Sequence, residues 1–119
     1  MAYPFFWVER DLIRSPAFLD LSFSASRALL YFFARCQYEK HKTSRREEWI
    51  ITNNGDIIFT YQEAEELGFA PGTFRNCLVE LQDHGFIHQT VKGHGAKGRD
   101  HRPSRFGITT DWRQWTHGT

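Results

Sequence analysis

The stretch TYQEAEELGFAPGTFRNCLVELQDHGFI, residues 60–87, predicts two short helices joined by a tight turn and followed by a strand. Thr60 and Glu63 have the spacing of a capping box, in which each side chain accepts a hydrogen bond from the other residue's backbone N–H. Gly68 stands where a helix ends in a left-handed residue. Pro71 suits the first turn of a second helix, because the N–H that it lacks has no partner there. The local sequence therefore predicts where one helix ends and the next begins.

The second helix has one apolar face, since its apolar residues recur at i, i+3, i+4 and i+7: Phe74, Cys77, Leu78 and Leu81. Gly85 ends this helix, and Phe86 and Ile87 begin a strand. Two short helices that cross steeply need a small residue at the crossing, and Ala64 supplies it. The opposite face of the second helix is left for a partner, so we interpret the pair as a helix-turn-helix. A plain helical hairpin within a core is the alternative.

The size of the chain favours one domain with one core. It has 119 residues, 40% hydrophobic and 16% aromatic, which excludes an intrinsically disordered chain. We therefore predict a single domain over residues 1–119. Residues 1–14 form an N-terminal extension that packs on the core or on a second subunit.

The sequence favours a cytoplasmic protein. No apolar run is long enough to cross a bilayer, and the aromatic stretch near the start lacks a basic leader and a cleavage site. The chain has two cysteines, Cys36 and Cys77, on expected apolar helical faces. We expect both to be reduced core thiols.

Two further helices are expected before the helix-turn-helix. Ser15 and Pro16 mark the start of the first, and Ser22 caps the second. The second has an apolar stripe of Ala25, Ala28, Leu29, Phe32, Phe33 and Cys36. A second line adds Leu30, Ala34 and Tyr38, so the helix should be covered on two sides. Together with the aromatic residues 3–7, this surplus of apolar surface predicts a homodimer.

The region between the helices predicts a β-hairpin. Residues 39–48 are charged and are expected to form a solvated loop. Residues 49–52 and 56–59 are rich in β-formers, and Asn53, Asn54 and Gly55 between them are typical of a hairpin turn. After the helix-turn-helix, residues 86–92 and 105–109 predict a second strand pair.

The basic charge of the chain is concentrated near its C-terminal end. Net charge is +1, yet residues 1–83 carry 9 Lys and Arg against 12 Asp and Glu, whereas residues 84–119 carry 6 against 2. The glycine-rich segment between the last two strands holds much of this surplus. A loop of this length within a small domain is usually functional or mobile.

This order of elements resembles a winged helix-turn-helix domain over about residues 22–115. More narrowly, it is similar to small winged-helix proteins of phages and bacteria associated with replication initiation or regulation. The resemblance rests on LSFSASRALLY at 21–31, on NNG at 53–55 and on LVELQDHGFI at 78–87. It implies an α+β, mainly helical fold, with a three-helix core, a small antiparallel sheet and a wing.

The resemblance also implies a function: sequence-specific binding of double-stranded DNA, by a transcriptional regulator or a replication-initiation module. Residues 71–84 would form the recognition helix in the major groove, and the basic wing 92–105 would lie on the backbone or in the minor groove. The expected DNA-binding residues are Thr73, Arg75, Asn76, Lys92, Lys97, Arg99, Arg102 and Arg105. The chain departs from the family in Ala70, where Ser or Thr usually caps the helix, and in two acids near the outer face, Glu80 and Asp83.

Other functional classes have weaker support. No nucleophile elbow, phosphate loop or acid–base pair is visible, so we expect no enzyme activity and no cofactor. His84 and His88 lie on different sides of Gly85, and no cysteine pair supports them, so we expect no metal site. No small-molecule ligand is inferred. The alternative function is a winged helix that binds another protein through the same helix face.

Overall fold

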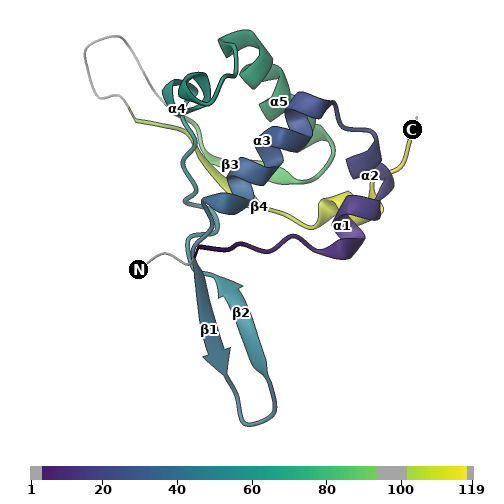
Figure 1. Ribbon diagram of the computed structural model, residues 1–119, viewed down its shortest axis with the longest axis vertical. Helices are drawn as coiled ribbons and strands as arrows, with labels where there is room; N and C mark the ends of the chain where they lie inside the picture. Colours follow the sequence, from purple (N-terminus) through teal and green to yellow (C-terminus); the bar gives the residue numbers. More distant parts are fainter. Residues whose placement is uncertain (1–3, 94–101, 118–119) are drawn as a thin grey trace.

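The computed structural model describes residues 4–93 and 102–117, and these form an α+β fold, as predicted (Figure 1). The helices are α1 (Arg10–Arg14), α2 (Pro16–Leu19), α3 (Phe23–Ala34), α4 (Tyr61–Glu66), α5 (Pro71–Asp83) and the 3-10 helix η1 (Asp111–Gln114). The strands are β1 (Tyr38–Lys42), β2 (Glu47–Ile51), β3 (Ile87–Val91) and β4 (Arg105–Ile108). β1 pairs with β2 and β3 pairs with β4, in two antiparallel sheets.

Helix α3 runs through the middle of the body and packs against α5 (Figure 1). The predicted apolar stripes of both helices are buried: Ala25, Ala28, Leu29, Phe32 and Phe33 in α3, and Phe74, Cys77, Leu78 and Leu81 in α5. The Phe32 ring meets Phe59 and Phe106 edge-on, with centroids 5.2 and 5.3 Å apart. Full burial of such a side chain contributes roughly 1.5–3 kcal/mol. The core therefore joins α3 to α5 and to β4.

The local signals around the helix pair are confirmed. Glu63 N–H donates to Thr60 Oγ1 and Thr60 N–H donates to Glu63 Oε1, both over 3.1 Å, which completes the capping box at the start of α4. Gly68 has φ +98°, a left-handed conformation that glycine adopts without a Cβ clash. Pro71 is the first residue of α5. These features depend on neighbours within four residues, so the sequence was sufficient to predict them.

Strands β3 and β4 form a sheet that contacts α5 through β3. Its register pairs Ile87 with Ile108 and Gln89 with Phe106. Residue Ile57 adds a single bridge to Phe106, with N–H to O distances of 3.0 and 2.8 Å in the two directions. Beyond β4, the indole of Trp112 stacks on Phe86 and is buried. The C-terminal part of the described chain thus closes the core.

The predicted hairpin of residues 49–52 and 56–59 is wrong. Residues 47–51 form β2, which pairs with β1, so the segment expected to be a solvated loop supplies a strand and a turn. The register brings cationic β1 side chains beside acidic β2 side chains, and Lys40 Nζ lies 2.8 Å from Glu47 Oε2. The polar composition of residues 39–48 does not by itself reveal this cross-strand charge pairing, because the pairing depends on how the two strands align. Helix α3 also ends earlier than its second stripe implied, since Tyr38 lies in β1.

The residues expected to make that hairpin turn instead fasten neighbouring elements. Asn53 Oδ1 accepts from Gln37 N–H over 2.8 Å, and Asn53 Nδ2 donates to the Arg35 carbonyl over 3.0 Å. Asn54 Oδ1 accepts from Ile108 N–H over 2.7 Å. The Asn53 side chain thus binds backbone groups at the end of α3, and the Asn54 side chain binds the backbone of β4. The chain therefore turns towards the sheet of β3 and β4 and not back onto β2.

The N-terminal segment packs at least partly on this same chain. Leu12 of α1 belongs to the buried core. The Trp7 ring lies 4.9 Å from Tyr38 and 5.0 Å from Trp49, between ring centroids, whereas Phe5 is largely exposed. Within residues 4–93 and 102–117, no helix has the length and apolar character needed to cross a membrane.

Candidate nucleic-acid interface

Helix α5 presents a polar face to solvent. Thr73, Arg75 and Asn76, which the sequence predicted to face outward, are exposed, and Val79 is 53% exposed. These exposed residues lie on the face of α5 opposite its buried apolar stripe, because the helix has 3.6 residues per turn. The three polar side chains therefore lie on one accessible helix that the core holds rigidly.

The acidic residue Glu80 does not belong to this face, which corrects the prediction. Its Oε2 accepts a hydrogen bond from the Ser22 backbone N–H over 2.7 Å. Ser22 caps α3, so the carboxylate lies at the positive end of that helix dipole. Asp83 remains exposed. The outer face of α5 thus carries less negative charge than the sequence suggested.

Two arginines of the α3 region hold α4 at its two ends. Arg27 Nη2 donates to the carbonyl of Leu67, the C-cap of α4, over 2.5 Å, and its guanidinium lies 4.7 Å from the Phe69 ring centroid. Arg35 Nη2 donates to Glu63 Oε2 over 2.8 Å at the other end. Arg27 and Arg35 are eight residues apart, which is about 12 Å along a helix. This separation matches the length of α4, which has six residues, together with its caps. The turn between α4 and α5 is therefore fixed from α3.

The stems of the basic 92–105 segment approach closely at Gly93. Ser104 Oγ accepts from Gly93 N–H and from Gln89 Nε2, each over 2.9 Å. A Cβ at position 93 would lie 2.7 Å from Ser104 N and 2.8 Å from Arg102 O, so only glycine fits there. Lys92 and Arg102, on the two stems, are exposed. The predicted residues Lys97 and Arg99 lie outside the described residues.

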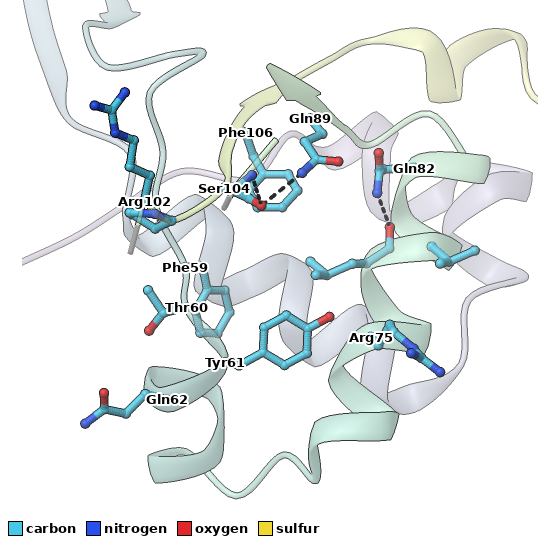
Figure 2. A pocket seen from close by; sticks show the side chains of 14 residues that line it. Phe59, Thr60, Tyr61, Gln62, Arg75, Gln82, Gln89, Arg102, Ser104 and Phe106 are labelled. Atoms are coloured by element: carbon cyan, nitrogen blue, oxygen red, sulfur yellow. Dashed lines mark hydrogen bonds between the residues drawn. The ribbon is translucent and has the colours of Figure 1, made fainter. Parts of the chain in front are cut away.

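A groove of about 500 Å³ separates α5 from these stems (Figure 2). Its floor is apolar, with Phe59, Tyr61, Leu78, Val79 and Phe106. Its polar lining comes from Thr60, Gln62, Arg75, Gln82, Gln89, Arg102 and Ser104. Figure 2 shows Arg75 on the α5 side and Arg102 on the opposite side, with both side chains extending outward from the groove. The groove therefore brings together side chains from α4, α5, β3 and the segment before β4.

The cations around the groove differ in their partners. No acidic side chain in the described part of the chain forms an ion pair with Arg75, Lys92 or Arg102. Arg105 is closer to an acid, since its Nη1 lies 3.7 Å from Asp56 Oδ1. The sequence did not associate Asp56 with this region. None of the described acids therefore competes with an external anion for these three predicted basic residues.

Several residues of the groove were not predicted as site residues, notably Tyr61, Gln62, Gln89 and Ser104. Tyr61 and Gln62 form the first turn of α4, directly after its cap. The capping signal at Thr60 placed them in the first turn of a helix, but nothing local indicated that this turn faces the basic segment. Gln89 and Ser104 are brought together by strand pairing, which a single sequence does not specify.

His84 is occupied by protein groups. Its Nδ1 lies 2.8 Å from the Glu80 carbonyl and its Nε2 lies 2.7 Å from Asp20 Oδ2, while its ring stacks on Trp115. Hydrogen bonding to His84, followed by the charge of His117, holds the pKa of Asp20 below its ordinary value of 3.8. The cluster fastens the end of α5 to α2.

Comparison with known proteins gave no relative: no family model matches this chain, and no curated protein or solved structure matches it significantly. The site must therefore be interpreted from its own residues.

Proposed function

We propose that this chain is a winged helix-turn-helix domain that binds double-stranded DNA sequence-specifically. In this proposal, α5 enters the major groove and the basic segment 92–105 lies on the backbone or in the minor groove. The biological role would be that of a transcriptional regulator or a replication-initiation module.

The observation that carries the proposal is the groove with an unpaired arginine on each side. Arg75 on α5 and Arg102 on the stem opposite it have no acidic partner among the described residues. Of the exposed arginines elsewhere, Arg46 and Arg113 have such a partner, whereas Arg10, Arg14 and Arg45 have none among the described residues. A B-DNA major groove, about 12 Å wide, admits one helix. A strand of sugar-phosphate backbone beside that helix would meet cations from both sides.

The chemistry of α5 suits base edges. Arginine donates two hydrogen bonds to guanine O6 and N7, and asparagine pairs with adenine N6 and N7. Arg75 and Asn76 are exposed on the same helix, four and five residues after its first residue, Pro71. Thr73, nearer the helix start, suits a phosphate contact, since hydroxyls commonly bind phosphate oxygens. Turning Glu80 towards α3 removes one repulsive charge from this face.

The chemistry of the 92–105 segment suits phosphates. Its five Lys and Arg residues oppose a single acid within the segment, Asp100. Each phosphate contact releases counterions, which favours binding and makes it dependent on salt. The Gly93–Ser104 contact fixes where this segment leaves the sheet.

A selection of bound duplexes from a random DNA pool tests the proposal. We expect enrichment of a short motif, and loss of its most selective positions when the selection is repeated with Arg75→Ala. Arg45→Ala, which removes the same charge from the far end of the molecule, is the matched control and should enrich the wild-type motif. Recovery of unenriched sequences by the wild type would contradict sequence-specific binding.

A second function has one observation in its favour, the apolar character of the groove. Tyr61 is 45% and Val79 53% exposed, and both line it. Tyrosine is common at protein interfaces. If the pool selection enriches nothing and Val79→Asp abolishes binding to a protein partner, the groove is a protein-binding site instead.

A further inference from the structure

Strands β1 and β2 form an arm that projects from the body, at the end of the molecule opposite α4 and α5 (Figure 1). The arm is a sheet of two strands, so each strand has one edge that faces no other strand in the described parts of the chain. An isolated two-stranded hairpin is marginally stable in water. The Trp7 ring already packs on Tyr38 and Trp49 of this arm, and a strand added at an edge would stabilise it further.

The two edges of the arm differ in composition. β1 reads YEKHK, and three of its five residues are Lys or His. Lysine on an edge strand blocks pairing with another chain. β2 reads EEWII and ends in three consecutive apolar residues, of which Ile50 is 40% exposed. The β2 edge is therefore the one suited to receive another strand.

The charges of the arm are unsuited to DNA. Lys40 and Lys42 both lie near Glu47, with N to O distances of 2.8 and 3.8 Å, and Arg46 Nη2 lies 3.1 Å from Glu48 Oε1. These three cations lie beside carboxylates within the arm, in contrast to Arg75 and Arg102, and of the arm's Lys and Arg residues Arg45 alone has no acidic partner among the described residues. The arm also points away from the groove between α5 and the 92–105 segment. A protein surface fits it better than a polyanion does.

We propose that β2 pairs antiparallel with β2 of a second copy of this chain, with Ile50 at the two-fold axis. The product is a four-stranded sheet in the order β1, β2, β2 of the partner, β1 of the partner. This surface is independent of the proposed DNA binding and remains if that proposal fails.

The sequence of β2 is complementary to itself in this arrangement. An antiparallel pair of identical strands has a two-fold axis perpendicular to the sheet, and with that axis at Ile50 the residues opposite one another are Ile50 with Ile50 and Trp49 with Ile51. Moving the axis to Trp49 would place Glu47 and Glu48 opposite isoleucines. Of these two registers, only the one with its axis at Ile50 keeps the carboxylates of Glu47 and Glu48 from facing isoleucines.

The backbone pattern agrees with this register. Thr52 N–H donates to the Gln37 carbonyl over 2.8 Å, and hydrogen-bonded pairs alternate along an antiparallel ladder. The pair Glu39 and Ile50 is therefore hydrogen-bonded inside the arm, so the backbone groups of the residues flanking Ile50 point to the outer edge. Between the copies, Ile50 would form a non-hydrogen-bonded pair with Cα atoms about 4.5 Å apart.

Light scattering on the full chain gives the first test. We expect about twice the 14.0 kDa of one chain for the wild type at 100 µM, a concentration of about 1.4 mg/mL. Ile50→Lys should give the single-chain mass, because it places two ammonium groups at the axis. Glu39→Lys is the matched control, since Glu39 stands opposite Ile50 in the arm but one strand further from the proposed axis, and it should keep the doubled mass. A single-chain mass for the wild type overturns the proposal, as does an equal loss of mass in both variants.

Cysteine cross-linking tests the register and detects an unfolded variant. The Cα separation of about 4.5 Å at the axis lies within the range that a disulfide bridges. Ile50→Cys should therefore form a covalent dimer on mild oxidation, and Glu39→Cys should not. The native thiols are poor competitors, because burial raises the pKa of Cys36 to about 11 and also raises the pKa of Cys77. A doubled mass in light scattering without an Ile50→Cys cross-link would overturn this pairing, provided that circular dichroism matches the wild type.

Discussion

The carboxylate of Glu80, in α5, accepts a hydrogen bond from the backbone N–H of Ser22 over 2.7 Å, although 58 residues separate the two. The contact joins the N-terminus of α3 to the last turn of α5. It orients the helix that we propose to enter DNA, and it withdraws one negative charge from that helix's outer face. A single side chain thus contributes both to the fold and to the electrostatics of the site.

Removing this carboxylate should weaken the fold. We expect Glu80→Ala to lower the free energy of unfolding by about 1 kcal/mol, the usual net value of one such hydrogen bond. Asp83→Ala, which removes an exposed acid from the same helix, is the control and should leave stability unchanged. Urea unfolding followed by circular dichroism measures both. Equal stability of Glu80→Ala and the wild type would show that the contact contributes nothing.

Arg27 should stabilise the turn between α4 and α5. Arg27→Met keeps much of the apolar stem but loses the hydrogen bond to Leu67 O and the contact with Phe69. The expected loss is about 1 kcal/mol, a fall in Tm of about 4 °C for a domain of this size. Arg10→Met, an exposed arginine of α1, serves as the control. A fall that is equal in both variants would argue against a specific role for Arg27.

Glu63 should make stability depend on pH. Its hydrogen bond from Arg35, with further bonds from Thr60, holds the pKa of Glu63 below the ordinary value of 4.5. A carboxyl whose pKa is lower in the folded state stabilises the fold above its unfolded pKa, and this contribution is lost as pH falls through the folded pKa. The difference in Tm between wild type and Glu63→Gln should therefore be largest near neutral pH and shrink below pH 4.5.

Thermal unfolding at pH 7 and at pH 3 measures this difference. Glu65→Gln, in the same helix but exposed, should show no such change. A Tm difference for Glu63→Gln that is the same at both pH values would contradict the stated cause.

Arg75 should contribute to sequence preference. Arg75→Ala is expected to lose about 1–3 kcal/mol on the best site, the value of one bidentate base contact, and little on random DNA. Competition titrations with the selected and the scrambled duplex measure this. An equal loss on both duplexes would make Arg75 a phosphate contact, whereas no loss on either would favour a protein partner for α5.

The elements that the sequence predicted well are those with short-range causes. The Thr60–Glu63 capping box, the left-handed Gly68 and Pro71 at the start of α5 all depend on residues within one turn. The apolar stripes of α3 and α5 are also local patterns, since their period is a property of one helix. Such signals predicted α2, α3, α4 and α5, whereas α1 lies in the segment that was expected to be an extension.

The parts that the sequence missed depend on partners far along the chain. Asn53 and Asn54 look like turn residues, but their amides bind the end of α3 and β4. The charges of residues 39–48 suggested a loop because their pairing with Glu47 appears only once two strands are aligned. In the candidate site, α5 and the basic stems were predicted, whereas Tyr61 and Gln89 were not, because only the folded chain brings them to one groove.

The salt dependence of DNA binding is the most direct test of whether the 92–105 segment binds DNA phosphates. Each phosphate contact lowers log K by about 0.9 per unit of log salt. Replacing Lys97, Arg99 and Arg102 with alanine should therefore weaken binding to every duplex alike and flatten the slope by up to about 3, without changing the preferred sequence. The matched control replaces Lys42, Arg45 and Arg46 at the arm tip, which removes the same charge and should leave the slope unchanged.

The measurement is fluorescence anisotropy with a labelled duplex, at several salt concentrations, for the wild type and both triple variants. Phosphate binding by the 92–105 segment predicts a flatter slope for the 97/99/102 variant alone. An equal slope for all three proteins would contradict phosphate binding by the 92–105 segment, and with it the proposal that this chain binds DNA through that segment and α5.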